Sequence, residues 1–200
     1  MKENSKITPE ESLKIISDTL LKSSKSLETS LLKHSLLWGI LVTITAMLVG
    51  HLWEHNGGPR WNFLWLAMMF VGIVLERVLF KNESKLPDGY LSSVFKFNGT
   101  LLGAFCFIFA IGGTLLVNLI DYNHAILLSI ASTSFFIIVF GFSSSITGYL
   151  MHNRFVIAMG LLSGTVGSIF AMMVDGSYKM LVIAAVAFIT MVLPYFLKRK

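Results

Sequence analysis

The sequence predicts an all-α polytopic membrane protein: a bundle of six transmembrane helices preceded by a cytoplasmic amphipathic helix. Three observations predict it. Charged residues make up 14% of the 200 residues, whereas an average soluble domain carries roughly 25%. The apolar class makes up 54%, and the mean hydropathy is +0.73. A soluble protein of this size exposes too much surface to cover it with so few charges.

Six apolar runs are each near the ~20 residues that a helix needs to cross a bilayer. They are continuously apolar, whereas the strands of a membrane barrel alternate over about ten residues, so we expect helices. The chain divides into a helical segment, residues 1–34, and a transmembrane domain, residues 35–200. The predicted spans are 35–53, 61–80, 99–120, 125–149, 155–174 and 180–197.

Lys and Arg lie mostly on one side of these spans. The N-terminal segment, the 2–3 and 4–5 loops and the C-terminal tail hold 14 of them, whereas the remaining loops hold Arg60 and Lys179. Because cytoplasmic loops are enriched in these residues, we expect both termini in the cytoplasm. The net charge of +5 is then a topology signal, and we expect no nucleic-acid partner.

The N-terminal segment predicts an amphipathic helix. Thr8, Pro9 and Glu11 suit a helix start, with Thr8 as the cap and Pro9 at the first helical position. Two interpretations stay open: a helix lying on the inner leaflet or a helix that docks on a partner. The apolar stripe that would dock consists of Leu13, Ile16, Leu20, Leu27 and Leu31.

A short pattern, H-x-x-E-H, lies at the outer end of the first span and consists of His51, Glu54 and His55. Such a pattern can place two zinc ligands one helical turn apart. Catalytic zinc needs a third protein ligand and a cleft, and the outer loops are too short to form one. We therefore expect no catalytic residue and no cofactor, with these three as candidates for a weak metal site.

Small residues recur at the spacing that lets membrane helices approach closely. Two G-x-x-x-G patterns occur, and Gly167 follows the second. We interpret them as packing faces, either inside one bundle or between two copies. The predicted packing residues are Gly99, Gly103, Gly160, Gly164 and Gly167.

The fourth span is rich in hydroxyl groups. These groups either bond to neighbouring backbone or line a polar path, as in transporters with broken helices. The residues of such a path would be Gly141, Ser143, Ser144, Ser145 and Thr147. Coupled transport usually places an ionisable group near the midplane, and this span has none, so we favour packing.

The order of parts resembles a group of small uncharacterised bacterial six-span membrane proteins with a cytoplasmic N-terminal amphipathic helix. The matching pieces are Leu36-Leu37-Trp38-Gly39 and Leu193-Pro194-Tyr195, although the glycine that the group has before its tyrosine is missing here. The resemblance implies a location in the bacterial inner membrane. It supplies no catalytic residues.

The leading hypothesis is a non-enzymatic inner-membrane protein that acts through helix association as a regulatory or accessory subunit. Its expected partners are the lipid bilayer and either a second copy or another membrane protein. The alternative is a small transporter or channel that uses the fourth span. A more remote alternative is a metal-dependent membrane enzyme at His51, Glu54 and His55.

Overall fold

The computed structural model describes residues 9–56, 59–81, 90–117 and 122–198, and the regular elements within them are helical. Side chains in the first helix are described from Glu28 onward. In chain order the elements are α1 (Pro9–Asn56), the 3-10 turn η1 (Pro59–Phe63), α2 (Leu64–Leu79), α3 (Tyr90–Val117), α4 (Tyr122–Leu150), α5 (Arg154–Met173), α6 (Tyr178–Ala187), the π-helical segment η2 (Phe188–Val192) and α7 (Leu193–Lys198).

Five helical stretches among the described residues are long and apolar enough to cross a membrane, which is the architecture of a multi-pass membrane protein. They are Glu28–His55, Trp61–Leu79, Ser132–Leu150, Arg154–Met173 and Tyr178–Leu197. Each matches a predicted span. The remaining predicted span, 99–120, falls largely on α3, which is not among the five, and its last three residues lie outside the described ranges. The sixth span therefore stays a prediction.

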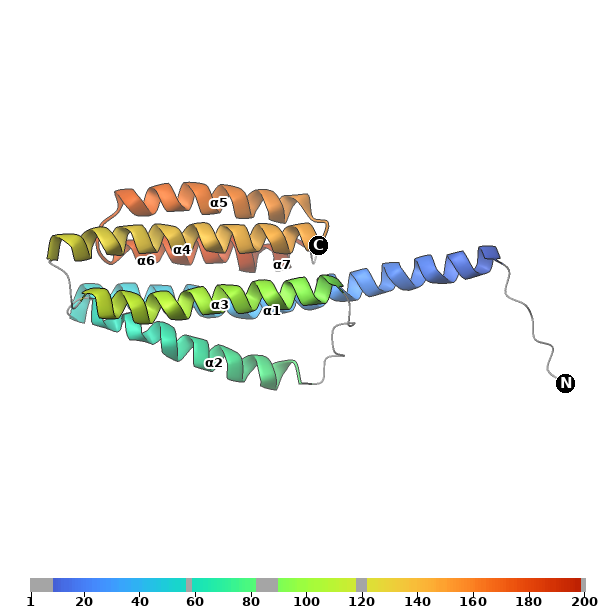
Figure 1. The fold of residues 1–200 in the computed structure, drawn as a ribbon, viewed down its shortest axis with the longest axis horizontal. Coiled ribbons are helices and arrows are strands. Elements are labelled where there is room, and N and C mark those ends of the chain that lie inside the picture. Colours follow the sequence, from blue (N-terminus) through green and yellow to red (C-terminus); the bar gives the residue numbers. More distant parts are fainter. Residues whose placement is uncertain (1–8, 57–58, 82–89, 118–121, 199–200) are drawn as a thin grey trace.

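The helices run alternately up and down along one direction (Figure 1). One end of the bundle carries Arg77, Lys81, Arg154 and the C-terminal α7. We call it the basic end. His51, His55 and Asp175 lie at the opposite end.

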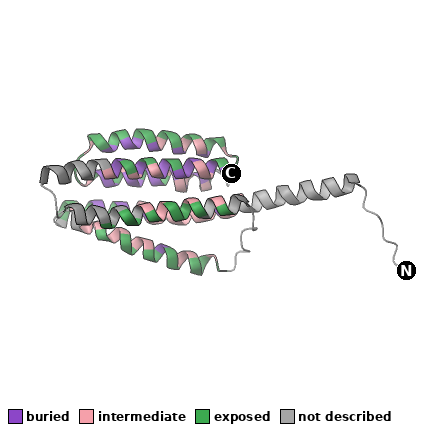
Figure 2. Cartoon of the chain, in the orientation of Figure 1, coloured by how far each residue is buried: buried purple, intermediate pink, exposed green. Residues whose placement is uncertain are grey.

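The core lies between α1, α4, α5 and α6, where buried residues concentrate (Figure 2). In contrast, α2 and α3 are mostly exposed or intermediate where they are described (Figure 2). Large apolar side chains on the outside suit a chain whose surroundings are lipid. The buried apolar cluster consists of Val42, Ala46, Val49, Ile137, Phe140, Ala171, Met180, Ile183, Ala184, Val186 and Ala187.

The first helix continues through the expected boundary at residue 34. It has 48 residues, which corresponds to about 72 Å at 1.5 Å per residue. Its sequence has no proline after the first position, and its two glycines, Gly39 and Gly50, lie against other helices. The boundary between 1–34 and 35–200 is thus a change in polarity within one helix. The N-terminal part of α1 extends past the basic end (Figure 1).

A tight turn joins α4 to α5 at the basic end. Asn153 caps α5, because its side-chain oxygen accepts hydrogen bonds from the backbone N–H groups of Phe155 at 3.1 Å and Val156 at 3.3 Å. His152 before it has a φ of 52°, in the left-handed region. The short turn places α5 antiparallel beside α4 (Figure 1).

Candidate functional site

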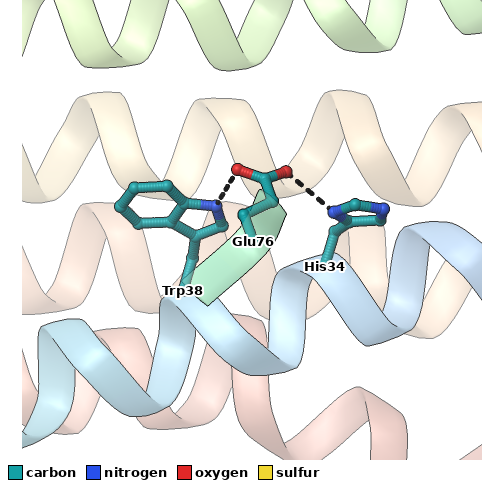
Figure 3. Close-up of polar contacts among 3 residues, drawn as sticks. All are labelled: His34, Trp38 and Glu76. Atoms are coloured by element: carbon teal, nitrogen blue, oxygen red, sulfur yellow. Dashed lines mark hydrogen bonds and ion pairs between the residues drawn. The ribbon is translucent and has the colours of Figure 1, made fainter. Parts of the chain in front are cut away.

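A polar cluster joins α1 to α2 near the basic end (Figure 3). His34 Nδ1 lies 2.8 Å from Glu76 Oε1, and Trp38 Nε1 donates to Glu76 Oε2 at 3.3 Å. A carboxylate has no proton to give, so His34 Nδ1 is the donor when Glu76 is ionised. The side chains of His34 and Glu76 are 17% and 36% exposed.

Close packing surrounds this cluster. The rings of His34 and Phe80 lie with their centroids 4.2 Å apart. A Cβ atom added to Gly72 would lie 2.6 Å from Cη2 and Cζ3 of Trp38, so the indole ring occupies the space beside that glycine. Gly72, Glu76 and Phe80 follow one another at intervals of about one helical turn, and they contact His34 and Trp38, which are one turn apart on α1.

Sequence reasoning did not find this cluster. Arg77 is exposed, whereas Glu76 contacts α1. The available signal was that His34, Trp38 and Glu76 share one predicted membrane depth, because a carboxylate at that depth needs hydrogen-bond partners.

The hydroxyl-rich segment of α4 packs against α5. A Cβ atom at Gly141 would lie 2.5 Å from the Cα atom of Gly164, and one at Gly160 would lie 2.5 Å from Ser145 Oγ. Ser134 Oγ also donates to the carbonyl of Ser168 at 3.3 Å. The two backbones therefore approach closely over several turns, as small residues permit.

The candidate polar-path residues contact protein groups. Ser145 Oγ donates to the carbonyls of Gly141 at 2.9 Å and Ile157 at 3.2 Å, and Thr147 Oγ1 donates to that of Ser143 at 3.0 Å. Ser143 Oγ in turn accepts from Asn98 Nδ2 at 2.9 Å, which links α4 to α3. Ser144 is buried.

The predicted packing glycines separate into two groups. Gly160, Gly164 and Gly167 are buried between helices, and a Cβ atom at Gly167 would lie 2.6 Å from Val186 Cγ2 of α6. A Cβ atom at Gly99 or Gly103 would meet no described atom within 4 Å. Among the described residues, nothing therefore packs on the G-x-x-x-G pattern of α3.

A π-helical segment lies where the last helix meets α1. Leu193 N–H bonds to the carbonyl of Phe188, five residues earlier, and Pro194 follows with no N–H to continue the ladder. Gly39 accommodates the resulting bulge, because a Cβ atom there would lie 2.6 Å from Met191 Cβ. Ser35 Oγ donates to the Met191 carbonyl at 3.3 Å.

The H-x-x-E-H residues do not assemble a metal centre in the described part of the chain. His51, Glu54 and His55 are exposed, and the two imidazole rings lie 4.3 Å apart. His55 Nδ1 lies 2.9 Å from the carbonyl of His51. The described residues contain no group of three or more His, Cys, Asp or Glu side chains close enough to bind a metal ion together.

The candidate docking stripe begins inside the bundle. Leu31 is fully buried, and together with Leu32 it packs against Met151 of the α4–α5 turn and Tyr195 of α7. The other four members, Leu13, Ile16, Leu20 and Leu27, belong to α1, but their side chains lie outside the described residues.

Comparisons with protein-family models, with curated proteins and with solved structures find no match. The resemblance to small bacterial membrane proteins therefore stays an expectation. Gly39 of the first piece lies against Met191 and Val192, which directly precede the second piece.

Proposed function

We propose that this chain is a non-enzymatic multi-pass protein of the bacterial inner membrane that acts through helix association, as a regulatory or accessory subunit. The observation that carries the proposal is the course of α1. One uninterrupted helix forms part of the buried core and then extends beyond the basic end (Figure 1). A partner that binds the outer part of α1 is thereby connected to the bundle without a flexible linker.

Two contacts hold α1 where it leaves the bundle. Leu31 and Leu32 pack against Met151 and Tyr195 on one side. His34 and Trp38 bond to Glu76 of α2 on another. These contacts fix the direction of the helix, as an arm that presents a docking surface requires. The positive-inside rule places the arm in the cytoplasm.

The packing of α4 favours association over transport. The hydroxyls of Ser145 and Thr147 bond to backbone carbonyls, and Gly141 lies against the backbone of α5. A polar path needs groups that are free to exchange their hydrogen bonds with a solute. Opening a path here would require separating two closely packed helices.

Native mass spectrometry of the protein in nanodiscs, prepared from the membranes that produce it, tests the proposal. We would compare the full chain, a variant lacking residues 1–8 and a variant lacking residues 1–27. The longer deletion ends before Glu28, so it leaves the described contacts of Leu31 and His34 intact. We expect a partner with the full chain and with the shorter deletion, and its loss with the longer one. Identical assemblies in all three samples would refute the proposal.

A further inference from the structure

The buried face of α1 has a regular register along the bundle. Leu31 and Val49 are both fully buried, and Val42 between them is nearly so. Leu31 and Val49 are 18 residues apart, which is about five turns at 3.6 residues per turn. Near the basic end this face meets the last helix, where Tyr195 packs against the buried cluster of Leu31, Leu32 and Met151.

The same register continues through the outer part of α1. Leu13 lies a further 18 residues before Leu31, again about five turns. At 100° per residue, Leu20 and Leu27 fall within about 40° of Leu31 around the helix axis, and so do Ser17 and Ser24. We call positions 13, 17, 20, 24 and 27 the outer seam.

Within residues 13–27 the charged residues lie away from the outer seam, because Lys14, Asp18, Lys22 and Lys25 fall about 100° or more from the direction of Leu31. Glu10 and Glu28, which flank this stretch at its two ends, lie about 60° from that direction. The outer seam is therefore an uncharged Leu and Ser surface that continues an established helix–helix interface. Its intramolecular partner, the last helix, reaches Lys198 in the described chain, and no other described element runs beside the outer part of α1 (Figure 1).

We propose that the outer seam binds an amphipathic helix of a different protein, which lies along α1 in line with α7. This inference rests on the proposed function and specifies its partner. The matching helix needs an apolar stripe of about four turns, because Leu13 and Leu27 are 14 residues apart. The small Ser17 and Ser24 suit close approach of its backbone.

A second copy of this chain in the same membrane does not fit this surface. Both copies would insert in the same orientation, so their α1 helices would run parallel at the usual 8–10 Å separation. The second α1, continuing into the bilayer on the seam side, would enter the space that α6, η2 and α7 occupy beside α1. The partner helix must therefore end at the basic end of the bundle.

Site-specific photo-crosslinking in the cells that make the protein tests the inference. The photoreactive residue p-benzoylphenylalanine replaces Ser24 on the seam or Lys22, about 180° from Leu31. A second pair of variants changes apolar residues of α1. Leu20→Asp alters the seam, whereas Ile15→Asp is the control, because Ile15 lies about 160° from Leu31 around the helix axis. Each of the pair is combined with the Ser24 probe.

We expect one protein adduct from position 24 and none from position 22. Leu20→Asp should lower the yield of the position-24 adduct at least about tenfold, as expected for a central interface residue. Ile15→Asp should change that yield by less than about twofold. An adduct of two copies of this chain, equal adducts from both positions, or lipid adducts alone would overturn the inference. If the 1–27 deletion still removes a partner in those cases, the proposed function stands and the seam assignment fails.

Discussion

At the scale of single residues, the contact between Glu76 and α1 is the polar feature that most directly fixes a helix position. A carboxylate near the bilayer is costly unless donors surround it. Here His34 and Trp38 both supply donors to it. The same contact makes the position of α2 depend on α1, the helix that extends past the basic end.

Replacing Glu76 by Leu should destabilise the protein by about 1–3 kcal/mol, because the donors of His34 and Trp38 lose their acceptor. Arg77→Leu at the exposed neighbouring position is the control and should change stability by less than about 0.5 kcal/mol. Denaturant unfolding in mixed micelles measures both. Equal effects of the two substitutions would show that the cluster of Figure 3 contributes nothing specific.

Gly160→Ala and Gly103→Ala should have opposite effects on the stability of the folded protein. The added Cβ at position 160 would lie 2.5 Å from Ser145 Oγ and 2.7 Å from the Gly141 carbonyl oxygen, whereas at position 103 it meets no described atom within 4 Å. We expect a loss of about 1–3 kcal/mol at position 160 and a gain of up to about 1 kcal/mol at position 103 from helix propensity. Thermal unfolding in detergent measures both. Destabilisation at position 103 would mean that a second copy packs on α3.

His152→Gly should stabilise the α4–α5 turn by about 0.5–1 kcal/mol, because His152 has a φ of 52° and glycine adopts that conformation without a steric penalty. Asn153→Ala should cost about 1 kcal/mol through loss of the helix cap. The same unfolding measurement applies. A destabilising His152→Gly substitution would indicate that the imidazole makes a contact that outweighs the strain.

At the scale of elements, apolar run length predicted most helix positions well. Five predicted spans coincide with apolar helices. The first and the last of these helices differ from a simple membrane-spanning α-helix. The first merges with the preceding helix. The last contains η2, because Pro194 cannot donate to the ladder. Polarity marks where a helix enters the membrane, but not where the helix begins.

Which helices touch could not be read from residue patterns. The G-x-x-x-G pattern of α3 is as regular as that of α5, yet the glycines of α5 contact α4 while Gly99 and Gly103 have no described neighbour within 4 Å. The pattern states that a close approach is permitted, and tertiary packing decides whether one occurs. The same limit explains why Glu76 and His34 were not paired in advance.

At the scale of the whole molecule, docking of a partner on the outer seam requires α1 to be one straight helix from the core to that seam. A helix lying on the inner leaflet would need a bend of roughly 90° near residue 34. The described contacts of Leu31, Ser35 and Trp38 are distributed along a helix without such a bend. The proposed function through a docked partner rests on that geometry.

The most direct test is a spin-label distance between positions 14 and 47 of the full chain in nanodiscs, with Cys106 replaced by Ser. Met47 is exposed on the bundle surface. A straight helix predicts about 50 Å from 33 residues at 1.5 Å each, whereas a right-angle bend at residue 34 predicts about 36 Å. A narrow distribution near 50 Å supports a straight α1 that projects from the bundle. A distribution centred near 36 Å would contradict it and return the N-terminal helix to the membrane surface.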